Sequence, residues 1–236
     1  MIIGIVVALP EELATLTAST VAKGGCLALT DKVWVACSGA GAANAAEAAK
    51  LLVANGVNRL ISWGCAGALS PDLRSGDLVV AERLIAADTE ELTMDVFWHT
   101  HTLDRLQTSH TVYTGDLVET LAMVAFSKDK QRLHEQTGAI AVDMESVAVA
   151  RVAWQYALPF LSIRAIADPA SMDLPPAVSY ALNANGEIEL WKLLVFLLRH
   201  PTQIPRLIKL GLHFNAAMKT LEAVAEQLEL NDTPRN

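Results

Sequence analysis

Short, continuous apolar runs alternate with segments of helical periodicity along most of the chain. Runs of this kind predict buried β-strands, here at residues 2–8, 33–37, 58–64, 139–143 and 159–167. The intervening pattern predicts helices that open at Pro10, that run through the alanine-rich stretch ending near Gly56, and that cover 128–137 and 145–156. Buried strands that alternate with helices are typical of an α/β fold whose mostly parallel sheet is covered on both faces.

The remaining segments give weaker signals. Residues 77–88 are rich in β-branched side chains, 89–116 are polar and irregular, and 117–126 resemble a short strand. The tail after Pro175 reads as mostly helical, with breaks near Pro201 and Pro205. A chain of 236 residues fits one domain (1–236), and we interpret the residues after about 186 as a helical C-terminal extension.

Composition narrows the class of protein. The balance of 18 basic and 26 acidic residues gives a net charge of −8, which disfavours nucleic acid as a partner and leaves a small molecule. Three cysteines without CxxC spacing predict reduced thiols in a cytoplasmic protein, and neither a disulfide framework nor a metal site. The apolar N-terminus lacks the basic residues of a signal peptide, and no apolar run reaches the length of a membrane span.

Three acids fall at the predicted strand ends, where α/β sheets bind their ligands. They are Glu12, Glu145 and Asp168, and Glu145 stands in the otherwise apolar stretch AIAVDMESVAVARVAW. Each has a structural alternative: the helix dipole favours acids in a first helical turn, and an aspartate before proline forms turns. Their convergence on one sheet edge favours chemistry.

Two further motifs indicate a function only weakly. SGAGAAN (38–44) begins like a dinucleotide-binding turn and raises a nicotinamide-dependent oxidoreductase as an alternative, but Asn44 replaces the third glycine. Close packing of a helix on the sheet explains this turn better. His99, His101 and His110 have zinc-compatible spacing in part, but no further ligand pattern accompanies them, and a solvated loop is the simpler interpretation.

Four motifs in order resemble the superfamily of purine nucleoside phosphorylases and methylthioadenosine/S-adenosylhomocysteine nucleosidases. They are IGIVVALPEEL, SGAG with WGCAGALSPDLRSGDLVVAER, AVDMESVAVARVA and IRAIADPA. The resemblance implies a three-layer nucleoside phosphorylase-like fold with a central mixed sheet. The VDMES form, IADPA followed by LPP, and RHPTQIPRLIKL are most similar to phosphorylase-like proteins of hopanoid lipid biosynthesis, which implies adenosylhopane as substrate.

The resemblance also implies roles for individual residues. Asp168 would protonate the departing purine, Glu145 would bind the ribose hydroxyls above Met144, and Glu12 would activate the attacking water. The remaining substrate-binding residues implied by it are Cys65, Ala66 and Gly67 of the glycine loop, together with Phe126 for purine stacking.

The nucleophile and the substrate stay open at this point. Ser62 stands where phosphorylases of the superfamily commonly carry an arginine, which puts a phosphate site in doubt. Glu12 favours water as the nucleophile, while phosphate remains open as a co-substrate. No other cofactor is expected. A methylthioadenosine/S-adenosylhomocysteine nucleosidase is the alternative within the same chemistry. A catalytically silent nucleoside-binding protein is a third class.

The tail and the family suggest partners. Apolar residues lie beside basic ones there, which fits core packing and also fits a lipid-linked substrate or peripheral contact with the inner face of a membrane. These residues are Trp191, Leu193, Leu194, Phe196, Leu197, Arg199, Arg206 and Lys209. Members of the superfamily form dimers or higher oligomers, so the resemblance implies a homo-oligomer, with a dimer favoured.

Overall fold

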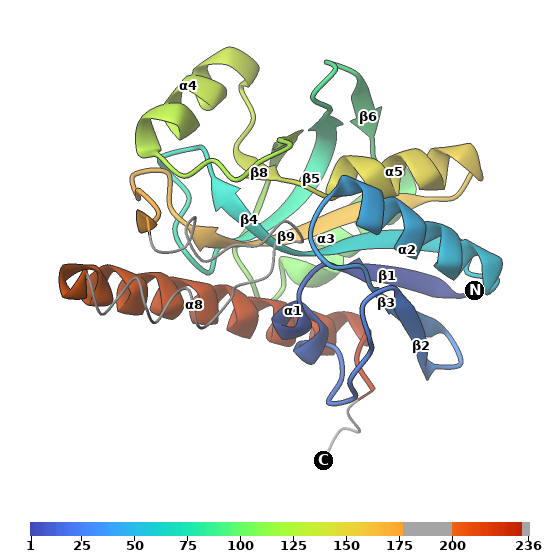
Figure 1. Ribbon diagram of the computed structural model, residues 1–236. Helices are drawn as coiled ribbons and strands as arrows, with labels where there is room; N and C mark the ends of the chain where they lie inside the picture. Colours follow the sequence, from blue (N-terminus) through green and yellow to red (C-terminus); the bar gives the residue numbers. More distant parts are fainter. Residues whose placement is uncertain (177–199, 233–236) are drawn as a thin grey trace.

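A computed structural model describes residues 1–176 and 200–232 as a mixed sheet between layers of helices (Figure 1). The strands are β1 (Ile3–Val7), β2 (Gly25–Thr30), β3 (Val33–Cys37), β4 (Arg59–Ala68), β5 (Leu78–Ile85), β6 (Glu91–Thr93), β7 (Val112–Glu119), β8 (Ala141–Asp143) and β9 (Phe160–Asp168). The helices are α1 (Pro10–Ala14), α2 (Ala42–Ala54), α3 (Val96–Leu106), α4 (Ser127–Thr137), α5 (Ser146–Gln155) and α8 (Ile204–Leu228), with a 3₁₀ turn η1 (Pro201–Gln203).

The sheet curls until part of it closes on itself. The order is β2-β3-β1-β4-β8-β7-β5-β6, and β9 pairs with both β4 and β5. Strands β4, β8, β7, β5 and β9 therefore form a ring in which each pairs with the next. Five of the pairings are parallel and four are antiparallel, so the expectation of a mostly parallel sheet is replaced by the mixed sheet that the family resemblance implied.

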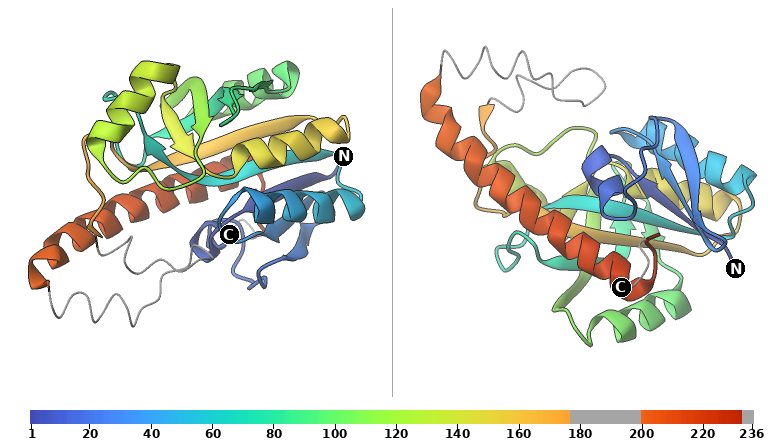
Figure 2. Two further views of the ribbon diagram at one scale, coloured as in Figure 1. Left: turned by 45° about the horizontal axis from the view of Figure 1, so that its top comes forward. Right: turned by 90° about the horizontal axis from the view of Figure 1, so that it is seen from below.

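Helices cover both faces of this sheet (Figure 2). On one face α2 and α5 pack against each other and against β1 and β4. On the other face α8 lies along β9 and also contacts α1 and α3. The core between the layers is built from the apolar strands and the small residues of α2 and α5, which let these helices approach the sheet closely.

The segment 89–116 corrects the prediction of an irregular insertion, because it contains β6, α3 and the start of β7. The side chain of Asp95 caps α3 by accepting a hydrogen bond from the amide of Trp98 at 2.8 Å. Helix α3 buries Trp98, Thr102 and Leu106, which are spaced by four residues. His99 and His101 therefore lie on a helix instead of a solvated loop.

Other differences concern element ends. Strand β4 continues through the predicted glycine loop to Ala68, whereas β7 ends at Glu119, well before residue 126. Strand β2 was not predicted at all. Pro205 lies in the first turn of α8 and so starts this helix, where a proline costs no hydrogen bond.

The described part of the C-terminal region joins the core. Helix α8 buries Ala217, Leu221, Val224 and Ala225 against the rest of the protein. The predicted apolar run Trp191–Leu197 and Arg199 lie outside the described residues. No helix within 1–176 and 200–232 is long and apolar enough to cross a membrane.

We predict that Leu221→Ala destabilises the whole protein by about 2–5 kcal/mol, because it leaves a cavity beneath α8 in a position with 0% exposure. Chemical denaturation followed by circular dichroism would measure this loss. Leu212→Ala is the matched control on the same helix, since Leu212 is 64% exposed and should change stability by less than about 0.5 kcal/mol. Equal stability of the two variants would contradict the assignment of α8 to the core.

Candidate active site

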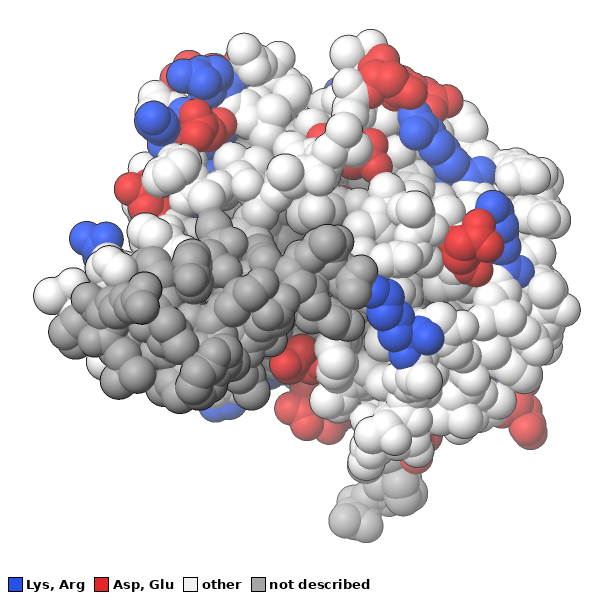
Figure 3. Space-filling view, in the orientation of Figure 1, with Lys and Arg blue, Asp and Glu red and all other residues white. Residues whose placement is uncertain are grey.

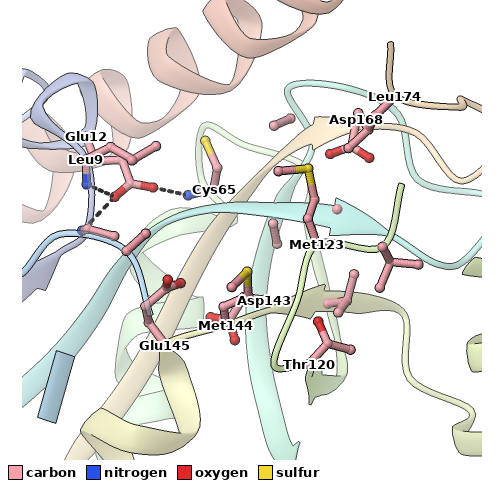
Figure 4. Close-up of a pocket in the computed structure, with 17 residues that line it drawn as sticks. Leu9, Glu12, Cys65, Thr120, Met123, Asp143, Met144, Glu145, Asp168 and Leu174 are labelled. Atoms are coloured by element: carbon pink, nitrogen blue, oxygen red, sulfur yellow. Dashed lines mark hydrogen bonds between the residues drawn. The ribbon is translucent and has the colours of Figure 1, made fainter. Parts of the chain in front are cut away.

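One cavity of about 230 Å³ lies at the carboxyl ends of the central strands (Figure 4). Residues that follow β1, β3, β7 and β8 line it, together with the last residues of β4 and β9. The lining residues are Ala8, Leu9, Glu12, Ala40, Cys65, Ala66, Gly67, Thr120, Met123, Val124, Val142, Asp143, Met144, Glu145, Ala167, Asp168 and Leu174. This is the ligand position predicted for an α/β sheet.

Glu12 is held rigidly at one side of the cavity. Its Oε2 accepts hydrogen bonds from the amides of Ala8 (2.9 Å) and Leu9 (3.0 Å), and its Oε1 accepts one from the amide of Cys65 (2.9 Å). Burial raises the pKa of Glu12, while the nearby Arg164 guanidinium and these amides act in the opposite direction. The carboxyl group is thus fixed in place before any ligand arrives.

The Glu12 carboxyl reaches Cys65 only because position 64 is a glycine. A Cβ on Gly64 would lie 2.3 Å from Oε1 of Glu12 and 2.7 Å from a terminal guanidinium nitrogen of Arg164. Real Cβ atoms do not approach other atoms so closely. The first glycine of the WGCAG motif, Gly64, therefore leaves space for the side chains of Glu12 and Arg164.

Arg164 is buried under the cavity in a polar cluster that satisfies it. Its Nε donates to Oδ2 of Asp143 at 2.8 Å, and its Nη2 donates to the hydroxyls of Ser62 (2.6 Å) and Ser146 (3.0 Å). The Ser146 hydroxyl also bonds to Asp143 and to Ser162. Asp143, one of the two acids in the apolar stretch, is thereby explained as the partner of the strand arginine.

Glu145 stands next to this cluster and remains partly exposed to the cavity. The amide of Gly41, in the SGAG turn that opens α2, donates to its Oε1 at 2.8 Å. Gly41 has φ +99°, a conformation that favours glycine. Burial and the nearby Asp143 raise the pKa of Glu145 to about 7, although Arg164 and the Gly41 amide lower it. The glycine turn thus serves to hold a carboxyl group in this structure.

Asp168 lies on the other side of the cavity from Glu12 and Glu145 in the close-up view (Figure 4). Its Oδ2 forms an ion pair with the ammonium group of Lys130, which comes from α4. Burial raises the pKa of Asp168, and the Lys130 ammonium lowers it. The cavity therefore has fixed acids at both sides of a mainly apolar floor.

Seven of the eight residues proposed from the sequence line this cavity, and their roles stay predictions. Phe126 does not line it: its side chain is 51% exposed, and its ring lies 5.5 Å from Nζ of Lys128. Met123 and Val124, in the loop between β7 and α4, line the cavity in this region instead, whereas Phe126 is the N-cap of α4. In Figure 4, Met123 lies between Asp168 on one side and Glu12 and Glu145 on the other.

Sequence reasoning missed Lys130, Thr120, Met123 and Leu174. Lys130 lies one helical turn before Leu133, which packs against buried residues. This spacing could have indicated that Lys130 points toward the protein interior. The other three lie in loops, whose path no periodicity predicts.

The outer surface separates into small mixed-charge groups. Arg151 pairs with Asp88 and Glu90, and Lys50 pairs with Glu47. On the face drawn in Figure 3, basic side chains lie mostly beside acidic ones over the described residues. Within these residues no three His, Cys, Asp or Glu side chains gather in a way that would hold a metal ion.

Curated relatives of this chain include two nucleosidases that it covers over most of their length. The 5′-methylthioadenosine/S-adenosylhomocysteine nucleosidase of Mycobacterium bovis is 29% identical, over 72% of this chain and 87% of that protein. The enzyme of the same name from Oceanobacillus iheyensis is 26% identical, over 79% of this chain and 94% of that protein.

Solved structures share the fold. The nucleosidase of Helicobacter pylori with butyl-thio-DADMe-Immucillin-A has a TM-score of 0.70 at 19% identity, covering 96% of this chain and 95% of that chain. The futalosine hydrolase of Helicobacter pylori has a TM-score of 0.70 at 19% identity, covering 97% of this chain and 95% of that chain. These likenesses confirm the predicted nucleoside phosphorylase-like fold.

A family model described as the Phosphorylase superfamily matches residues 2–185, which include all the described lining residues of the cavity. The chain therefore belongs to the Phosphorylase superfamily, which confirms the resemblance predicted from its four motifs.

Proposed function

We propose that this protein cleaves the N-glycosidic bond of a 5′-substituted adenosine and releases adenine. The observation that carries the proposal is the cavity itself, in which Glu12 and Glu145 lie apart from Asp168. Membership of the superfamily supports an enzyme that cleaves N-glycosyl bonds. The names of the curated relatives, which are nucleosidases for adenosine derivatives, support adenine as the base.

Each acid has a task in this reaction. As the bond from C1′ to the purine breaks, positive charge develops on the ribose and negative charge on the base. Glu145 would accept hydrogen bonds from the ribose hydroxyls, which strengthen as the sugar becomes cationic and so lower the barrier. Asp168, carrying a proton, would donate it to N7 of the leaving purine.

Water is the nucleophile that the cavity favours. Glu12 would accept a proton from a water molecule as its oxygen bonds to C1′, which yields the free sugar. A phosphate dianion needs cationic clamps, whereas the lining includes four acids and, among its described residues, neither lysine nor arginine. Ser62, at the position of the expected phosphate-binding arginine, is buried in the Arg164 cluster.

The comparisons favour methylthioadenosine and S-adenosylhomocysteine over adenosylhopane as substrates, because the curated relatives named above carry the first two in their names. Apolar side chains of Leu9, Met123 and Leu174 line the cavity and suit an apolar 5′ group of either kind. Much of the tail that suggested a lipid lies outside the described residues. Adenosylhopane therefore enters the experiment as the competing substrate.

The test is adenine release from methylthioadenosine, S-adenosylhomocysteine and adenosylhopane, each with and without phosphate. We expect release from the first two at a rate independent of phosphate, with a sugar product that carries no phosphate by mass spectrometry. Release from adenosylhopane alone would support a substrate from hopanoid biosynthesis. Formation of a sugar 1-phosphate would contradict water as the nucleophile. Binding without release from any of the three would leave a silent nucleoside-binding protein.

We predict that Asp168→Asn and Glu145→Gln each lower kcat at least about 100-fold, the scale of a lost catalytic proton donor or transition-state hydrogen bond. Initial-rate assays would measure this, and circular dichroism would show whether the fold is kept. Asp104→Asn, on the exposed side of α3, is the matched control and should retain full activity. Near-normal turnover in either site variant would remove that residue from the mechanism.

The pH profile provides a further prediction. Glu145 must be ionised for its charge to stabilise the cationic sugar, and Glu12 must be ionised to accept a proton from water. The pKa of Glu145 is raised to about 7. We therefore expect kcat/KM to fall as the pH drops through about 7 and Glu145 becomes protonated. In Glu145→Gln this midpoint should disappear. A midpoint that stays near 7 in the variant would assign the titration to another group.

A further inference from the structure

Lys130 is a fully buried lysine that has no role in the reaction proposed above. It has 0% exposure, and its ammonium group donates to Oδ2 of Asp168 and to the carbonyl oxygens of Pro169 (3.1 Å) and Met172 (3.2 Å). A lysine has three N–H donors, so all of them are engaged. The lysine thereby ties α4 to the end of β9, across 38 residues of sequence.

Folding alone gives little reason for a charge at this place. Burying an ammonium group is costly, and an apolar side chain of similar length would fill the same space without that cost. Lys130 lies next to the partly buried Leu133 on the inward side of α4. A leucine or methionine here would lose the hydrogen bonds to Asp168 and to the carbonyl oxygens of Pro169 and Met172. Of these three acceptors, only Asp168 carries a charge.

That bond divides the two oxygens of the Asp168 carboxyl between two surroundings. Oδ2 is taken by Lys130, whereas no hydrogen bond from the described residues reaches Oδ1. Asp168 also lines the cavity. One oxygen is therefore anchored on the protein, and the other is available to a ligand.

We propose that Lys130 is the positioning residue of the leaving-group acid: it orients the Asp168 carboxyl so that Oδ1 meets the purine, and its charge makes that carboxyl a stronger acid. This inference rests on the proposed function, because it requires Asp168 to give a proton to the base. Lys130 itself touches Asp168 and acts through it, while the proton passes from Asp168 to N7.

The charges around the carboxyl determine the sign of the effect. Burial raises the pKa of Asp168, Lys130 lowers it most strongly, and His213 of α8 lowers it further. Two further groups are close enough to interact electrostatically: Cys65, whose pKa Asp168 raises, and Asp173, whose pKa Lys130 lowers. Without Lys130 the carboxyl remains buried and loses its main source of positive charge, so its pKa must rise and it stays protonated to higher pH.

Two neutral variants separate charge from packing. Lys130→Met fills the space without a donor, and Lys130→Gln keeps a donor for the carbonyl oxygens without the charge. We expect both to lower kcat about 10- to 100-fold, the effect of one hydrogen bond to a charged group. In both, the limb of the pH profile that Asp168→Asn abolishes should move to higher pH.

Lys128→Met is the matched control, because Lys128 lies exposed on the same helix with its ammonium over the ring of Phe126. It should leave both kcat and the pH profile unchanged. Lys130→Arg retains the charge and should keep the limb close to its wild-type position. A lower kcat with an unmoved limb in both neutral variants would mean that Lys130 only supports the fold, and would overturn the inference.

A double-mutant cycle separates this inference from the proposed function. If Lys130 acts through Asp168, adding Lys130→Gln to Asp168→Asn should cause no further loss of kcat. Additive losses would contradict the coupling. If the wild-type protein releases no adenine, the proposed function itself fails. If Asp168→Asn retains full activity, the role of Asp168 fails and that of Lys130 with it. If Asp168→Asn is inactive while the Lys130 variants match wild type, only the role of Lys130 fails.

Discussion

The need to hold four carboxyl groups around one small cavity governs this structure. Glu12, Asp143, Glu145 and Asp168 all line the cavity, and like charges this close raise one another's free energy. Two buried cations offset them from below and from the side: Arg164 binds Asp143, and Lys130 binds Asp168. Backbone amides donate to the other two acids, three to Glu12 and one to Glu145.

This arrangement suits a reaction in which a sugar becomes cationic. The two cations are occupied by Asp143 and Asp168, which leaves Glu12 and Glu145 held by neutral donors. Their negative charge faces the cavity in fixed positions, so no reorganisation is needed as positive charge develops on a ligand. The rigid ring of strands beneath them, with Arg164 in β9 and Ser62 in β4, keeps these positions.

Helix α3 illustrates how far pattern reasoning reaches. Its signals were present, since Asp95 is a favourable N-cap and Trp98, Thr102 and Leu106 follow at helical spacing, yet the polar and histidine-rich surroundings concealed them. Phe126 illustrates the opposite error. An aromatic residue in a loop suggested base stacking, but Met123 and Val124 of this loop line the cavity, whereas Phe126 does not and is half exposed.

The sequence by itself predicted most strands of the core, the main helices and three acids that line the cavity, because buried strands have local apolar patterns and Glu12, Glu145 and Asp168 lie at or shortly after the ends of such strands. It also determined the family, through the order of four motifs. Only the tertiary structure decided the curl of the sheet, the pairing of Arg164 with Asp143, and the placement of Lys130 against Asp168. These features join residues far apart in the chain, and the free energy of such contacts depends on packing and burial that no local pattern encodes.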